Sequence, residues 1–90
     1  MNKERRKSID EIIQRLNNAL TEIESASEDI DSLKSEEEEY KDNIPESMQN
    51  GEKYCLAEEA IENMDSAITS LDGLADSITE AIEYLETSKG

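Results

Sequence analysis

Carboxylates are the most abundant reactive groups in this chain of 90 residues, which has 24 Asp and Glu, nine Lys and Arg, and no His. Glu58, Glu59 and Glu62 lie close together and could bind a divalent cation weakly, although a solvated helix face explains them better. Asp29 and Asp31 form an Asp-x-Asp pair, but the glycine and terminal glutamate of a calcium-binding loop do not follow in register. We therefore expect no metal site.

The side chains that usually build enzyme active sites are scarce. Because histidine is absent, the chain has no imidazole for acid–base catalysis or metal binding. The three glycines stand at positions 51, 73 and 90, so no glycine-rich phosphate loop is present. Carboxylates can perform acid–base catalysis inside a cleft, but two long helices with a thin core offer no obvious cleft. We expect a protein that is not an enzyme and has neither a catalytic residue nor a cofactor.

Composition also bounds the cellular setting and the partners. Cys55 is the single cysteine, so no internal disulfide can form, and a reducing cytoplasm is the natural location. Residues 1–7 are mostly charged and no apolar run follows them, so we expect no signal peptide and no membrane contact. The formal net charge of −15 disfavours direct binding to nucleic acid, because like charges repel. It favours a basic partner, or simply high solubility.

The first half of the chain has the residue spacing of one long helix, expected at about residues 3–41. Its apolar residues alternate steps of four and three through Ile9, Ile13, Leu16, Leu20 and Ile23. The alternation then slips by two successive steps of three and resumes through Ala26, Ile30, Leu33, Glu37 and Tyr40. We interpret this slip as a stammer, a local phase change at which the helix could bend.

The second half, expected to be helical at about residues 53–87, follows a seven-residue repeat with three apolar lanes. The lanes are Ala57, Met64, Leu71, Ile78 and Leu85; Ala60, Ala67, Leu74 and Ala81; and Ile61, Ile68, Ala75 and Ile82. They span an arc of about 100°, wider than the two-lane stripe of a simple coiled coil, so one neighbouring helix cannot cover them. Gly73 lies on the outward side, almost level with the stammer if the helices pair.

Residues 42–52 form the expected connection. Asn43 and Glu46 have the spacing of a cap at a helix start, with Pro45 in the first turn, which predicts one short helical turn at residues 45–49. We expect Ile44 and Met48 to fold inward and close the end of the bundle.

These features predict an all-α protein with a single domain at residues 1–90. Two helices of matched length with a short connection form an antiparallel hairpin. Because the apolar stripe is too wide for one partner, we expect self-association into a homodimeric four-helix bundle or a higher helical oligomer. The expected oligomer interface consists of Ile61, Met64, Ile68, Leu71, Leu74, Ile78, Ile82 and Leu85.

Charge is unevenly distributed along the chain. Four bases precede Ser8, whereas the rest of the chain has 23 acidic and five basic residues, a net charge of −18. The lane of Asn63, Ser70, Ser77 and Tyr84 is uncharged, which suits a neutral flank against another subunit and an acidic flank facing outward. The acidic residues expected to contact a partner are Glu36, Glu37, Glu38, Glu39, Glu58, Glu62, Asp65, Asp72, Asp76, Glu80 and Glu83. An acidic coat that only confers solubility is the competing interpretation.

The stretch from Asn43 to Tyr54, NIPESMQNGEKY, is followed by AEEAI at residues 57–61 and preceded, at residues 2–7, by NKERRK. This sequence resembles small acidic helical proteins encoded by phages and mobile elements of Gram-positive bacteria. The similarity covers nearly the whole chain, and residues 43–54 are its distinctive part. The resemblance implies a phage setting, in which small acidic proteins often inhibit host defence or host DNA transactions.

The leading functional hypothesis is an interaction protein that binds and inhibits a basic host protein, for example a defence protein, as a nucleic-acid mimic. One alternative is an oligomeric sponge for a small signalling nucleotide. It would use a tyrosine for stacking and the cations Lys3, Arg5, Arg6, Lys7 and Arg15. A further alternative is a structural assembly factor without a ligand.

Overall fold

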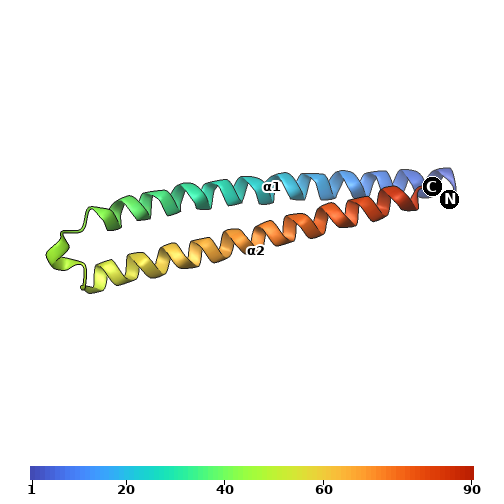
Figure 1. Ribbon diagram of the computed structural model, residues 1–90. Helices are drawn as coiled ribbons and strands as arrows, with labels where there is room; N and C mark the ends of the chain where they lie inside the picture. Colours follow the sequence, from blue (N-terminus) through green and yellow to red (C-terminus); the bar gives the residue numbers. More distant parts are fainter.

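A computed structural model describes residues 1–90 as two antiparallel helices joined by a short turn (Figure 1). Helix α1 spans Lys3–Asp42, the 3-10 turn η1 spans Glu46–Met48, and α2 spans Glu52–Ser88, with no strands. The molecule measures 70 × 14 × 13 Å, and both termini lie at the end opposite the turn. The prediction of an all-α hairpin is confirmed. The helices expected at 3–41 and 53–87 correspond to α1 and α2, with bounds that differ by at most one residue.

Local sequence signals explain where the helices begin and end. Asn2 caps α1, because its Oδ1 accepts a hydrogen bond from the Arg5 backbone N–H at 2.8 Å. Asn43 ends α1, and its backbone N–H donates to the Glu39 carbonyl at 3.1 Å. The prediction that Asn43 caps the following turn is therefore wrong: α1 still uses its backbone, and Pro45 stands at the start of η1 without a side-chain cap.

The turn packs less tightly than expected. Ile44 is partly buried, but Met48 is 58% exposed, so the prediction that Met48 folds inward is wrong. The reason is that η1 lies beyond the ends of both helices, so no helix covers Met48 (Figure 1). Gly51 then leads directly into α2, since its N–H donates to the Met48 carbonyl at 3.0 Å and a Cβ there would crowd the same oxygen.

The hairpin interface is the row of partly or fully buried residues on each helix. On α1 this row is Ile9, Ile13, Leu16, Leu20, Ile23, Ser27, Ile30, Lys34, Glu37 and Lys41. On α2 it is Tyr54, Ala57, Ile61, Met64, Ile68, Leu71, Ala75, Ile78, Ile82, Leu85 and Lys89, with Ala60 and Ala81 at its edge. Ile13 and Ala57, which are 7% and 2% exposed, are the two most buried residues of the chain. A single hairpin therefore has almost no core.

The α1 side of this interface alternates steps of four and three from Ile9 to Lys41 without a phase change. The predicted stammer is thus absent from the packing. Ser27 and Lys34 occupy interface positions, while Leu33 and Tyr40 are 56% and 47% exposed. The physical reason is that two paired helices keep one 3.5-residue period along their length, so polar residues enter the interface where the apolar pattern shifts.

Candidate interaction surfaces

Lys34 lies in the hairpin interface and connects the two helices on one side. Its Nζ is 2.7 Å from Asp65 Oδ1 on α2 and 3.7 Å from Glu38 Oε1 on α1. The hydrogen bond to Asp65 raises the pKa of Lys34 above its ordinary value, against a smaller opposing effect of desolvation. Glu38 and Asp65 therefore lie on the same side of the hairpin.

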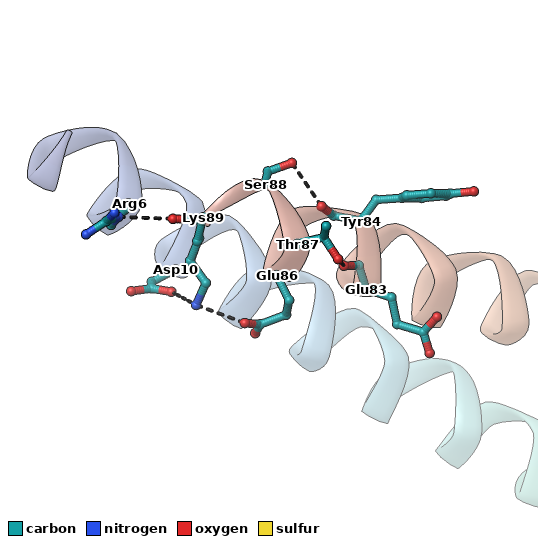
Figure 2. A network of polar contacts seen from close by, with 8 residues as sticks. All are labelled: Arg6, Asp10, Glu83, Tyr84, Glu86, Thr87, Ser88 and Lys89. Atoms are coloured by element: carbon teal, nitrogen blue, oxygen red, sulfur yellow. Dashed lines mark hydrogen bonds and ion pairs between the residues drawn. The ribbon is translucent and has the colours of Figure 1, made fainter. Parts of the chain in front are cut away.

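Lys89 repeats this arrangement at the opposite end of the hairpin (Figure 2). Its Nζ is 2.6 Å from Asp10 Oδ1 on α1 and 2.9 Å from Glu86 Oε2 near the end of α2. The hydrogen bonds to Asp10 and then Glu86 raise the pKa of Lys89. Both lysines thus meet one carboxylate from each helix, which shows that the acidic flanks of α1 and α2 share one side.

We call this side the acidic face. It consists of Asp10, Glu24, Asp31 and Glu38 on α1, and of Glu58, Glu62, Asp65, Asp72, Asp76, Glu83 and Glu86 on α2. All of these residues are exposed. Because Lys34 and Lys89 are already paired with its carboxylates, the remaining acidic groups are available to a basic partner.

The acidic residues predicted to contact a partner do not all lie on this face. Seven of them do: Glu38, Glu58, Glu62, Asp65, Asp72, Asp76 and Glu83. Glu37 is partly buried in the hairpin interface, and Glu36, Glu39 and Glu80 lie on other sides of their helices. The face also contains four residues that are not among the predicted ones, namely Asp10, Glu24, Asp31 and Glu86. The long-range pair of Asp10 with Lys89 had no sequence signal.

The opposite side of the hairpin, which we call the apolar face, is built from seven-residue repeats. On α1 the repeat is Ile12, Ala19, Ala26, Leu33 and Tyr40; on α2 it is Ala60, Ala67, Leu74 and Ala81. Beside the latter lies the outer row of α2: Leu56, Asn63, Ser70, Ser77 and Tyr84. A paired helix has one flanking row on each side of the interface, so the rows opposite the acidic face lie together.

The hairpin surface has three hollows, two of them beside the apolar face and one at the turn. One, of about 330 Å³, is lined by Tyr40 of α1 and by Leu56 and Ala57 of α2, among others, which shows directly that these flanks share a side. The largest, of about 660 Å³, lies at the turn, and the third lies along α2 beside Ala81. Of the eight exposed large apolar residues, four belong to this face and two, Leu56 and Tyr84, to the outer row of α2 beside it; Met1 and Met48 belong to neither.

The residues predicted to form an oligomer interface are divided between two environments. Ile61, Met64, Ile68, Leu71, Ile78, Ile82 and Leu85 are partly buried against α1, whereas Leu74 is 47% exposed on the apolar face. Sequence reasoning missed the contribution of α1 to this face. The repeat from Ile12 to Tyr40 at intervals of seven was the signal that could have revealed it.

The basic N-terminal end contacts the C-terminus. Arg6 Nε donates to the Lys89 carbonyl at 3.1 Å (Figure 2), and none of the three hollows lies beside Lys3, Arg5 or Lys7. No group of three or more potential ligand side chains is placed to hold a metal ion, and Cys55 is free and exposed. Neither helix has a stretch long and apolar enough to cross a bilayer.

Comparison of the chain with protein-family models, curated proteins and solved structures found no match.

Proposed function

We propose that the protein is a non-enzymatic, homo-oligomeric interaction protein whose acidic face binds and inhibits a basic host protein. The observation that carries this proposal is the convergence of carboxylates from both helices on one side, where Lys34 and Lys89 are already paired. The resemblance to small phage proteins supplies the setting: the cytoplasm of a Gram-positive host, with a defence protein or a nucleic-acid-binding protein as the target.

The spacing of the charges suits a partner that normally binds nucleic acid. The 11 carboxylates of the acidic face lie between residues 10 and 38 on α1 and between residues 58 and 86 on α2, which is 28 residues or about 42 Å along each helix. The two helices together therefore present about one carboxylate per 4 Å, a continuous line of negative charge that is sparser than the phosphates of a duplex, at about one charge per 1.7 Å. A groove lined with lysine and arginine could therefore accept the acidic face.

Self-association is the second part of the proposal. The hairpin exposes 6769 Å², whereas a globular monomer of 10.1 kDa exposes about 5,300 Å². The excess of about 1,500 Å² exceeds the roughly 800 Å² that each partner buries in a standard interface. A four-helix bundle formed through the apolar faces would bury this surface and leave the acidic faces outside.

The nucleotide-sponge alternative receives less support from the geometry. The cations that it requires, Lys3, Arg5, Lys7 and Arg15, line none of the hollows, and Arg6 is engaged by the Lys89 carbonyl. Calorimetry with cyclic nucleotides separates the two functions, because our proposal predicts no heat of binding. A structural assembly factor without a ligand would differ from our proposal by capturing no basic protein.

The proposal is tested by affinity capture from a Gram-positive host lysate followed by mass spectrometry. We expect a basic protein to be captured at low salt and released at about 0.5 M salt, because ionic screening weakens contacts between exposed charges. The variant Glu58→Gln/Asp72→Asn/Asp76→Asn should lose at least about tenfold in affinity for that protein. The control Glu11→Gln/Glu39→Gln/Glu59→Gln removes the same charge from other sides of the helices and should retain binding. Equal loss in both variants, or capture that is insensitive to salt, would contradict the proposal.

A further inference from the structure

We propose that two copies pair through their apolar faces about a two-fold axis parallel to the long axis of the hairpin, so that both turns lie at the same end. This arrangement rests on the self-association proposed above and specifies its geometry. It places α1 of each copy against α2 of the other.

The apolar face combines small and large apolar side chains with little charge. Ala19 and Ala26 on α1 and Ala67 on α2 are exposed, and their small side chains permit close approach of another helix pair. Leu33 and Leu74 provide large apolar side chains beside them. A second copy places its own acidic face on the far side, so the most negative surfaces of the two copies point away from each other.

The outer rows that border the apolar face differ in charge, and this difference selects the orientation of the two copies. The apolar face is bordered on α1 by an outer row of charged residues, Arg15, Glu22, Asp29 and Glu36, whereas the outer row of α2 is uncharged. Face-to-face pairing allows two two-fold arrangements. If the turns lay at opposite ends, α1 would oppose α1 and the two acidic outer rows would repel each other. If the turns lie at the same end, each acidic row meets an uncharged row instead.

The register of the hairpin makes this match specific. Lys34 pairs with Asp65 and Lys89 with Asp10, so these numbers total 99, whereas Arg6 contacts Lys89 and Lys41 contacts Tyr54, so these total 95. Residues at about the same height on α1 and α2 therefore have numbers that total about 95–99, and a two-fold axis along the hairpin preserves height between copies. The residues of the α1 outer row, Arg15, Glu22, Asp29 and Glu36, are then within about one helical turn of Tyr84, Ser77, Ser70 and Asn63 of the second copy.

In each of these four pairs, the α1 side chain of one copy can interact favourably with the α2 side chain of the other. The Arg15 guanidinium would lie beside the Tyr84 ring, which is 68% exposed in the hairpin and points away from α1 (Figure 2). The hydroxyls of Ser77 and Ser70 can donate hydrogen bonds to the carboxylates of Glu22 and Asp29. The Asn63 amide can donate in the same way to Glu36.

The orientation can be measured on the unmodified sequence, because Cys55 is the single cysteine and is exposed near the turn. A spin label on Cys55 gives the distance between the two copies by pulsed electron paramagnetic resonance. With the turns at the same end, the labels would lie across a four-helix bundle, roughly 20–35 Å apart including their linkers. With the turns at opposite ends, they would be separated by most of the helix length, roughly 50 Å.

Substitutions test the face and the charge match separately, and Ser66, which is exposed away from the apolar face, provides the control site. Ala67→Glu should raise the dimer dissociation constant about 100-fold, whereas Ser66→Glu, with the same added charge, should change it little. Ser70→Lys should lower the dissociation constant about three- to tenfold relative to Ser66→Lys, because the two new lysines would each meet Asp29 of the other copy.

A short label distance with tighter association of Ser70→Lys is the expected result. A dimer with a long label distance would overturn the same-end arrangement while leaving self-association intact. An unchanged dimer dissociation constant in Ala67→Glu would show that the apolar face is not the interface. A labelled protein that stays monomeric would overturn both the arrangement and the self-association on which it rests, without affecting the proposed role of the acidic face.

Discussion

Lys34 and Asp65 are joined across the hairpin by a 2.7 Å contact at a level where a two-helix interface normally packs apolar side chains. The lysine stem lies in the interface while its ammonium reaches the acidic face, where Glu38 also approaches it. The same geometry recurs at Lys89, so the hairpin has one cross-helix lysine–carboxylate pair toward its turn and another near its termini.

These pairs predict a loss of stability at alkaline pH. Hydrogen bonding to Asp65 raises the pKa of Lys34 above 10.5, and hydrogen bonding to Asp10 raises the pKa of Lys89. A lysine whose pKa is higher in the folded than in the unfolded state stabilises the fold fully at a pH below its unfolded-state pKa. This stabilisation is lost as the pH rises through the folded-state pKa. Melting temperatures measured from pH 9 to about pH 12 should fall above pH 10.5, and less steeply in Lys34→Gln/Lys89→Gln. An identical fall in that double variant would show that other groups cause it.

Ser27 predicts a stabilising substitution. Its Oγ is buried in the hairpin interface and has no hydrogen-bond partner. Ser27→Ala removes the unsatisfied hydroxyl and introduces a better helix former, so the free energy of unfolding should rise by about 1 kcal/mol. Urea unfolding followed by circular dichroism measures this change. Ser25→Ala, at an exposed position of the same helix, is the control. Its free energy of unfolding should rise only by the smaller amount that comes from the higher helix propensity of alanine. A loss of stability in Ser27→Ala would mean that the hydroxyl is satisfied in solution.

The two inner glycines should respond oppositely to alanine. A Cβ at Gly73 would meet nothing within 4 Å, so Gly73→Ala should stabilise α2 by up to about 1 kcal/mol. A Cβ at Gly51 would lie 3.0 Å from the Met48 carbonyl oxygen, so Gly51→Ala should lower the melting temperature. Differential scanning calorimetry compares the two variants directly. A decrease for Gly73→Ala would indicate that this outward side of α2 is covered in solution.

Ile68 and Glu62 form a contrasting pair on α2. Ile68 is partly buried against α1, and burying such a side chain fully is worth roughly 1.5–3 kcal/mol. Ile68→Asp places a charge in an interface in which only Ile13 and Ala57 are less than 9% exposed, so we expect the protein to be largely unfolded and monomeric. Glu62→Gln changes an exposed side chain and should keep the helical circular dichroism spectrum. A folded Ile68→Asp variant would contradict the assigned interface.

The helices could be predicted from the sequence because α2 repeats its apolar residues at helical intervals and a short connection forces an antiparallel return. The facing residues of α1 could be predicted only in part: the predicted stripe from Ile9 to Ile23, together with Ile30 and Glu37, does lie in the interface. Ala26, Leu33 and Tyr40 belong to the same predicted stripe but are exposed, because the period shared with the partner helix places Ser27, Lys34 and Lys41 in the interface instead. The expectation that Gly73 is level with the shift at Ala26 agrees with the register set by Lys34 and Asp65.

The two faces of the hairpin could likewise be predicted only in part from the sequence. The uncharged row from Asn63 to Tyr84 was visible in the sequence, since it involves one helix only. The matching apolar row on α1, from Ile12 to Tyr40, became a face only when the Lys34 and Lys89 pairs showed which flanks of the two helices lie together. Side-by-side placement of rows from different helices requires the register, which no local pattern contains.

The central claim is that a single hairpin is incomplete and pairs through its apolar face. The most direct test is the mass of the purified wild-type protein, measured by light scattering at micromolar concentration after size-exclusion chromatography. We predict a mass of twice 10.1 kDa, with Ala67→Glu shifted toward the monomer. A stable wild-type monomer of 10.1 kDa would contradict the claim.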